Sequence, residues 1–205
     1  MSNTTRASSE KNNNIRKRKK RPFVHGLLDL FDVVVVSWVI VITIFTFFIF
    51  KVEVDGNSMK NTLQNRDQLI ATNFNYTPAA GDIIIISRNY TNSTKDIEQS
   101  QQPIVKRVIA VEGDMVEIKE GKVFVNDIQL NEPYLDKNLI DNYTPEIDFI
   151  GKQMVPENCV FVLGDNRIDS HDSRSRDLGF IQNNYILGKV IYRVFPFDSF
   201  KSFTE

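Results

Sequence analysis

Ser58 and Lys106 are two residues whose types can perform nucleophilic chemistry together. Ser58 lies in the run Gly56-Asn57-Ser58-Met59, and Lys106 lies in the middle of an apolar run from Ile104 to Val111. Burial disfavours the charged ammonium, and a fully buried lysine can lose several units from its usual pKa of about 10.4. A neutral lysine can then take the proton of a serine hydroxyl, so the pair suggests Ser/Lys nucleophilic catalysis.

Both residues also have a plainer interpretation. By itself the run around Ser58 is typical of a loop that leads into a short helix over residues 60–64, with the serine as a cap. Lys106 can also extend from an edge strand and keep its ammonium in water. In a strand Lys106 shares a face with Ile104, Val108 and Ala110, but the opposite face is equally apolar, so the pattern leaves both interpretations open.

A polar loop from Gly164 to Arg174 follows the apolar run Cys159–Leu163. Its density of charged and hydroxyl side chains predicts a loop held by hydrogen bonds and ion pairs. The run Ser170-His171-Asp172 does not predict a catalytic triad, because neighbouring residues of an extended segment point to alternate sides. We expect His171 to face solvent.

Short strand-like patterns dominate the chain beyond residue 50, so we predict a mainly β domain. Glu120-Gly121 separates two of the predicted strands and is typical of a hairpin turn. The polar segments 89–102 and 127–157 are expected to be loops or insertions. The predicted strands are Gln68–Thr72, Asp82–Arg88, Ile104–Val111, Met115–Lys119, Lys122–Asn126, Cys159–Leu163 and Leu187–Phe195.

A single hydrophobic span from Val33 to Phe50 has 18 residues without a charge, and a helix of that length covers about 27 Å, close to the bilayer core. A cleaved signal peptide is the alternative, but no small-residue cleavage pattern follows. We therefore predict a retained transmembrane helix over 33–50. Ser58 lies eight positions after Phe50, at most about 29 Å away along an extended chain, and hence beside the membrane.

The two sides of the span differ in charge. Residues 1–32 hold eight Lys or Arg and three Asp or Glu, including the basic run Arg16–Arg21, whereas the remainder is acidic. Cytoplasmic flanks are enriched in Lys and Arg, so the N-terminus is expected inside and residues 51–205 outside, as one extracytoplasmic domain. Residues 1–32 are expected to be a disordered cytoplasmic tail. A basic run beside a span favours contact with anionic lipid over nucleic acid.

Four sequence blocks resemble those of bacterial type I signal peptidases, in the same order and after an anchor as in that family. The blocks are Gly56-Asn57-Ser58-Met59 with Thr62-Leu63, Gly81-Asp82-Ile83-Ile84, Lys106-Arg107-Val108-Ile109 with Gly113-Asp114, and Gly164-Asp165-Asn166-Arg167 through Asp172-Ser173-Arg174. The single span and compact insertion are similar to the Gram-positive form. The resemblance implies one transmembrane helix followed by an all-β catalytic domain with a small β insertion.

The resemblance also implies roles for individual residues. Ser58 corresponds to the nucleophile and Lys106 to the general base, with the backbone N–H of Ser58 in the oxyanion hole. Ser170 corresponds to a hydroxyl that holds the lysine, and Asp172 and Arg174 to a bracing ion pair. Some members add a serine hydroxyl to the oxyanion hole where this chain has Gly56, which leaves the second donor open.

A further departure is Asn61, which stands where the family usually has proline. We expect other contacts to keep the turn.

The implied activity is removal of signal peptides from exported preproteins after small residues in an A-x-A-like pattern. The substrate would add to an exposed strand edge, and the expected walls of its site are Asp82, Ile83, Ile84, Ile104 and Val105. We expect no cofactor and no metal, since the two histidines and Cys159 form no zinc-like cluster. The expected partners are secretory preproteins and membrane lipid, with the export channel as a further candidate and no nucleic acid.

Two other functions fit part of the pattern. Self-cleaving repressors share the Ser/Lys pair, but the anchor argues against them and no DNA-binding segment is evident. An anchored, non-catalytic β-rich binding module or an inactive relative would explain the departures at Gly56 and Asn61.

Overall fold

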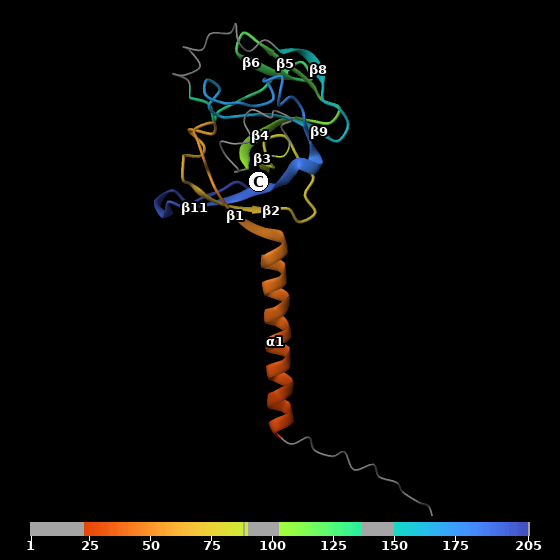
Figure 1. The fold of residues 1–205 in the computed structure, drawn as a ribbon, viewed down its shortest axis with the longest axis vertical. Coiled ribbons are helices and arrows are strands. Elements are labelled where there is room, and N and C mark those ends of the chain that lie inside the picture. The colour runs from red at the N-terminus through yellow and green to blue at the C-terminus, as the bar shows by residue number, and fades with distance from the viewer. Residues whose placement is uncertain (1–22, 88, 90–102, 137–149, 205) are drawn as a thin grey trace, which may run out of the picture. The chain divides into compact units, whose positions relative to one another are not determined.

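The computed structural model describes residues 23–87, 89, 103–136 and 150–204 (Figure 1). The chain divides into two compact units, Met1–Ile42 and Thr43–Glu205. The predicted disordered tail lies outside the described residues as far as residue 22, and so do residues 90–102 and 137–149 of the predicted loops.

The N-terminal element is one helix, α1, over Phe23–Phe48. Its stretch Leu28–Phe48 is long and apolar enough to cross a membrane. The helix begins ten residues before the predicted span, so residues 23–32 are helical and do not belong to a disordered tail. Gly26 within this first part causes no break, because the helix continues through it.

The C-terminal boundary of the predicted span also differs, because Ile49 and Phe50 begin strand β1, Ile49–Glu53. β1 pairs antiparallel with β2, Gln68–Thr72, with Phe50 opposite Ala71. β-Branched and aromatic residues suit both a lipid-facing helix and a strand, so the composition contains no boundary at Phe48.

Every strand pairing in the described part of the chain is antiparallel, which confirms the mainly β prediction. The larger sheet has the order β1-β2-β11-β3-β4-β9-β10, with β12 beside β11, and the smaller has the order β7-β6-β5-β8. The remaining strands of the larger sheet are β3 (Ile83–Ile86), β4 (Ile104–Val111), β9 (Cys159–Leu163), β10 (Ile181–Gln182), β11 (Ile186–Phe195) and β12 (Lys201–Ser202). The smaller sheet contains β5 (Met115–Lys119), β6 (Lys122–Val125), β7 (Ile128–Gln129) and β8 (Ile150–Met154), and two short 3-10 helices, η3 (Asn183–Tyr185) and η4 (Phe197–Ser199), flank β11.

The predicted hairpin is confirmed as β5 and β6. Glu120 and Gly121 have φ angles of 51° and 69°. Two positive φ angles in a two-residue loop match the twist of the strands that it joins.

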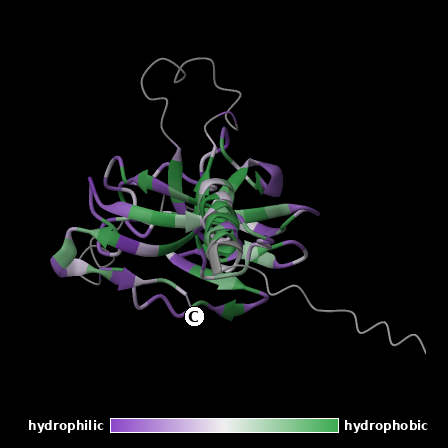
Figure 2. Ribbon diagram, turned by 90° about the horizontal axis from the view of Figure 1, so that it is seen from below, coloured by the Kyte–Doolittle hydropathy of each residue, from purple (hydrophilic) through white to green (hydrophobic). Residues whose placement is uncertain are grey.

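The larger sheet packs apolar residues against both faces of its central strands. In β3, Ile83 and Ile85 belong to one buried cluster, and Ile84 and Ile86 belong to another. Figure 2 shows apolar residues gathered in the strands, while the connecting turns are largely polar. A strand buried on both faces reads as a continuous apolar run, which is the pattern Ile83–Ile86.

The register of β3 and β4 places the site residues. Lys106 lies opposite Ile84, and Arg107 lies opposite Ile83. Neighbouring residues of a strand point to opposite faces, so Lys106 and Arg107 leave the sheet on different sides. β4 thereby supplies one cation to each face.

Candidate active site

The side chains of Ser58 and Lys106 meet, although one comes from a loop after β1 and the other from the middle of β4. Lys106 Nζ donates a hydrogen bond to Ser58 Oγ at 2.6 Å. Lys106 is only 3% exposed, whereas Ser58 is partly exposed. A buried amine in contact with an accessible hydroxyl is the geometry that a general base and a nucleophile require.

Burial lowers the pKa of Lys106 to about 8. The carboxylate of Asp172 opposes this shift and the guanidinium of Arg174 adds to it, with smaller opposing contributions from Asp165 and Asp169. Desolvation dominates because the ammonium loses its water within the core. A lysine that extended into solvent would show no such loss, so the geometry favours the buried interpretation.

Ser58 is held in a compact turn. The buried side chains of Met59 and Leu63 anchor the turn in the core, and the backbone N–H of Leu63 donates to the Met59 carbonyl at 2.8 Å. Asn61 has a φ of 85°, a left-handed conformation that interrupts the helix expected over residues 60–64. Asparagine tolerates this conformation better than most residues. Backbone hydrogen bonds therefore hold this turn, although Asn61 stands where the family that this chain resembles usually has proline.

The polar loop after β9 contacts the backbone of Ser58. The backbone N–H of Asn166 donates to the Ser58 carbonyl at 2.9 Å. A Cβ on Gly164 would lie 2.4 Å from that same carbonyl oxygen and 2.1 Å from Ser170 Oγ. Only glycine fits at position 164, because any side chain would displace Ser58 or Ser170.

An ion pair between Asp172 and Arg174 braces this loop. Arg174 Nε donates to Asp172 Oδ1 at 2.8 Å, and a second guanidinium nitrogen donates to Oδ2 at 2.9 Å. Asp172 Oδ2 also accepts from the backbone N–H of Gly164 at 2.9 Å. Bidentate pairs of this kind fix geometry as well as energy. The structure thus brings Asp172 and Arg174 together around Gly164, the position that has no room for a side chain beside Ser58.

Ser170 lies in the same loop, and its buried Oγ makes no hydrogen bond to any residue that the structure describes. The hydrogen bond expected between this hydroxyl and Lys106 is therefore not formed within the described chain. His171 is about half exposed and contacts the carboxylate of Asp177 at 3.0 Å. Asp172 pairs with Arg174 and not with His171. The run Ser170-His171-Asp172 therefore forms no triad.

Arg107 organises the opposite face of β4. Its guanidinium grips Asp165 through two hydrogen bonds of 2.8 and 2.6 Å, and donates to the carbonyl of Gly81 at 2.9 Å. Thr62 donates to the same carboxylate, so Asp165 joins β4 to the turn that holds Ser58. The polar character of the loop predicted such bonds, but nothing in the sequence pairs Arg107 with Asp165.

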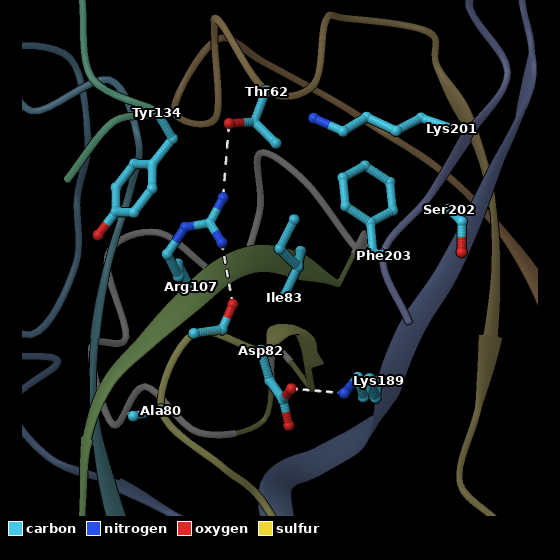
Figure 3. Close-up of a pocket in the computed structure, with 11 residues that line it drawn as sticks. Thr62, Ala80, Asp82, Ile83, Arg107, Tyr134, Lys189, Lys201, Ser202 and Phe203 are labelled. Carbon is cyan, nitrogen blue, oxygen red and sulfur yellow. Dashed lines mark hydrogen bonds and ion pairs between the residues drawn. The ribbon is translucent and has the colours of Figure 1, made fainter. Parts of the chain in front are cut away.

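A pocket of about 360 Å³ opens on this face (Figure 3). Arg107, Tyr134 and Lys201 are among its lining residues, and Lys189 pairs with Asp82 at 2.6 Å. Neither Ser58 nor Lys106 lines it. The pocket is therefore separate from the Ser58–Lys106 pair.

The backbone N–H of Ser58 forms no hydrogen bond with residues in the described ranges. By contrast, the N–H of Gly56 donates to Asn65 Oδ1 at 3.0 Å. Ser58 thus has a free donor next to its own hydroxyl, as an oxyanion site needs, whereas the amide of Gly56 is already used.

The residues expected to line the substrate site fall into two groups. Ile83 and Ile84 are core residues of β3, a strand paired on both edges, and the Asp82 carbonyl already accepts from Val108. β3 therefore already has a partner strand on each side, β11 and β4.

Ile104 and Val105 differ, because β4 pairs with β9 only from Arg107 onward. One edge of β4 beside Lys106 is thus unpaired within the described residues.

Among the residues that the structure describes, no group of three or more His, Cys, Asp or Glu side chains is arranged to hold a metal ion.

A sequence profile of the family described as "Signal peptidase, peptidase S26" matches residues 27–195. The chain belongs to the peptidase S26 family. It is 37% identical over 158 residues to a signal peptidase I of Bacillus caldolyticus, covering 72% of this chain and 80% of the relative. It is 32% identical over 188 residues to signal peptidase I P of Bacillus subtilis subsp. natto, covering 89% and 94%. With signal peptidase I S of Bacillus subtilis strain 168 the identity is 30% over 198 residues, covering 93% and 98%.

Membership of the S26 family confirms the resemblance seen in the four sequence blocks. All four blocks contribute to the contacts around Ser58 and Lys106. The second does so through Ile84, which lies opposite Lys106, and through the Gly81 carbonyl, which accepts from Arg107. Sequence reasoning missed one participating segment, Glu132–Tyr134, which contacts both Arg107 and Arg167. The sequence predicts this segment only as part of a loop or insertion over 127–157, and its one sequence signal is an aromatic residue within a polar stretch.

Proposed function

We propose that this chain is a membrane-anchored serine endopeptidase that removes N-terminal signal peptides from exported preproteins. Ser58 is its nucleophile and Lys106 its general base. The observation that carries the proposal is the 2.6 Å contact between Lys106 Nζ and Ser58 Oγ at a lysine only 3% exposed. Membership of the S26 family supplies the substrate class.

The reaction follows from this contact. Neutral Lys106 takes the hydroxyl proton while Ser58 Oγ attacks the carbonyl carbon of the scissile bond. The resulting oxyanion accepts a hydrogen bond from the free N–H of Ser58. Lys106 then gives its proton to the leaving amine as the C–N bond breaks. A water molecule deprotonated by Lys106 hydrolyses the acyl-enzyme and restores Ser58.

The lowered pKa of Lys106 makes the base available. With a pKa of about 8, about a tenth of the lysine is neutral at pH 7. At its ordinary value of 10.5 the neutral fraction would be about 300-fold smaller. Burial of Lys106 therefore supplies the base form without a histidine.

Three residues of the polar loop support the lysine. The ion pair of Asp172 and Arg174 keeps the loop folded over Ser58. Ser170 supplies a buried hydroxyl that is available to the ammonium formed when Lys106 accepts its proton. Gly56 allows the positive φ with which the chain enters the nucleophile turn.

The substrate binds as an added strand. The unpaired edge of β4 at Ile104 and Val105 can hydrogen-bond an extended peptide directly beside Lys106. Cleavage after small residues in an A-x-A-like pattern is the expected preference. Asp82, Ile83 and Ile84 contribute from behind, because β3 supports β4 from its other edge.

The membrane anchor is α1, with the N-terminus in the cytoplasm and the catalytic unit outside the cell membrane. The support for this orientation is the basic run Arg16–Arg21 on the N-terminal side of the span. The same run contacts anionic lipid head groups, and association with the export channel would bring preproteins to the enzyme.

An anchored binding module or an inactive relative is the competing function. The departures at Gly56 and Asn61 are its only support. Neither disturbs the Ser58–Lys106 contact, since the Asn61 turn is closed by its own hydrogen bonds.

Cleavage of a preprotein by the full-length protein in detergent tests the proposal. We expect Ser58→Ala and Lys106→Met each to lower the rate by at least about a thousandfold, because a nucleophile and its base act as a unit. Lys60→Ala is the matched control, since Lys60 is an exposed lysine two residues after the nucleophile. Cleavage by the wild-type protein removes the binding-module alternative, and retained cleavage in either dyad variant contradicts the mechanism.

A further inference from the structure

A segment that follows strand β7 of the smaller sheet reaches the loop that covers Ser58. After β7 the chain turns through Glu132, Pro133 and Tyr134. The Glu132 carboxylate forms an ion pair with the Arg167 guanidinium, and their side chains are only 9% and 10% exposed. An ion pair this buried is tolerated only when its remaining hydrogen-bonding groups are satisfied.

Those groups are satisfied by residues on both sides. Tyr134 OH donates to Glu132 Oε1 at 2.9 Å. Arg167 Nε donates to the Gly164 carbonyl at 3.1 Å. A Cβ on Gly164 would meet both the Ser58 carbonyl and Ser170, and the N–H of the nearby Asn166 donates to that carbonyl at 2.9 Å. Glu132 is therefore linked through Arg167 to the loop that hydrogen-bonds the backbone of Ser58.

The same segment also contacts the strand that carries the base. The ring of Tyr134 lies against the guanidinium of Arg107, with 4.0 Å from the guanidinium carbon to the ring centroid. Figure 3 shows the two side chains next to each other at the pocket. Arg107 follows Lys106 in β4 and grips Asp165, the neighbour of Gly164. Glu132 and Tyr134 thus reach the immediate neighbours of both dyad residues.

From these contacts we propose that Glu132 and Tyr134 are positioning residues. They hold the loop of residues 164–167 against Ser58 and thereby exclude water from the Lys106 amine. This inference rests on the proposed peptidase function. It gives the segment after β7 a role in positioning Ser58 and Lys106, although neither Glu132 nor Tyr134 touches the reacting atoms.

This positioning role has a consequence for proton transfer that separates it from a merely stabilising contact. The charged groups with the largest effect on the pKa of Lys106 come from the covering loop: Asp165, Asp169, Asp172 and Arg174. Glu132 pairs with Arg167 of the same loop, so its effect on the lysine is expected to pass through the loop. If the loop loosens when Glu132 is changed, water reaches Lys106 and its pKa rises towards the value of a solvated lysine.

Full-length protein in detergent, with a signal-peptide substrate, tests this inference through Glu132→Gln. We expect kcat to fall about tenfold with KM changed less than about twofold, because substrate contacts are untouched while dyad geometry is loosened. We also expect the acid limb of the kcat profile to move about one pH unit higher. Glu117→Gln is the matched control, since Glu117 lies in the smaller sheet and is likewise paired with a cation, Lys119, but forms no hydrogen bond or ion pair with the described loop of residues 164–167.

Tyr134 provides a second pair of variants, which guards against a Glu132 variant that fails to fold. Tyr134→Phe keeps the ring on Arg107 but removes the hydroxyl that donates to Glu132, and we expect an intermediate shift of the acid limb. Tyr134→Leu removes both contacts and should shift it as far as Glu132→Gln does.

Two results overturn the inference: wild-type kinetics in Glu132→Gln, or a lower kcat with an unchanged pH profile and a parallel loss of thermal stability. Either result leaves the proposed function standing, provided that the wild-type and Glu117→Gln proteins cleave the substrate. Absence of cleavage by the wild-type protein would instead contradict the proposed function.

Discussion

Lys106 Nζ lies 2.6 Å from Ser58 Oγ, and the lysine that makes this contact is 3% exposed. The sequence separation of 48 residues is bridged because β1 leads into the nucleophile turn and β4 carries Lys106 into the core. Burial of the amine and access to the hydroxyl are thus produced by different elements. A substitution can therefore change the burial of the Lys106 amine without changing access to the Ser58 hydroxyl, or the reverse.

The pH dependence of cleavage follows from the lowered pKa of Lys106. Only the neutral amine can accept a proton, so we expect kcat/KM to rise about tenfold per pH unit below about pH 8 and to level off above it. A profile measured from pH 5.5 to 9.5 checks this. An acid limb that continues to climb beyond pH 9.5 would mean that Lys106 is solvated and would contradict its assignment as the base.

Stability should depend on pH in the same region. The folded pKa of Lys106 is about 8 and its ordinary value is 10.5, so the unfolded chain binds more protons between these values and stability rises with pH there. Below pH 8 the buried ammonium costs on the order of 3 kcal/mol. We therefore expect Lys106→Met to be more stable than the wild type at pH 7, with the difference shrinking towards pH 10.5. Chemical denaturation at several pH values measures it, and a constant difference would argue against the buried charge.

Gly164→Ala should damage the site through its new methyl group. A Cβ at this position would meet the Ser58 carbonyl oxygen at 2.4 Å and Ser170 Oγ at 2.1 Å. Displacement of the nucleophile backbone should lower kcat at least about tenfold. Gly113→Ala is the control, because Gly113 has a positive φ but open space around its Cα. It should lose stability and keep its kcat, and equal kcat values in the two variants would refute the steric explanation.

How far the sequence predicts the fold depends on the residues that flank each helix or strand. β4, β5 and β9 have the predicted bounds, because polar or glycine residues flank their apolar runs. β1 was missed because Ile49 continues the apolar helix without a break. The two-residue strands β7, β10 and β12 are too short for any periodicity.

The site divides in a similar way between local and long-range information. Ser58 and Lys106 are identifiable because chemically suitable residues lie in recognisable blocks. The contact of Glu132 with Arg167 joins residues 35 positions apart, and that of Arg107 with Asp165 joins residues 58 positions apart. A single sequence does not show which residues of two distant segments lie opposite each other. These partners are therefore identified only from the three-dimensional structure.

The turn at Asn61 should reject the proline that is usual at this position in the family. Its φ of 85° lies far from the φ of about −65° that proline imposes. We expect Asn61→Pro to cost more than about 1 kcal/mol and to reduce cleavage, because Ser58 belongs to the same turn. Asn61→Gly, which adopts positive φ freely, should leave both properties nearly unchanged. Thermal unfolding and cleavage of the two variants decide the matter, and a proline variant as active and stable as the wild type would show that the turn has another conformation.

The connection between the anchor and the nucleophile should be important only for substrates in the membrane. α1 ends at Phe48 and β1 starts at Ile49, so a paired strand and not a flexible linker leads towards Ser58. A flexible insert between Phe48 and Ile49 would uncouple the β domain from the end of the helix. We expect slower cleavage of a membrane-embedded preprotein in vesicles and unchanged cleavage of a short signal-peptide analogue in detergent. The same insert between Glu120 and Gly121, in an exposed hairpin turn of the smaller sheet, is the control. Undiminished cleavage of the embedded preprotein would mean that the short connection does not set the position of Ser58 relative to its substrate.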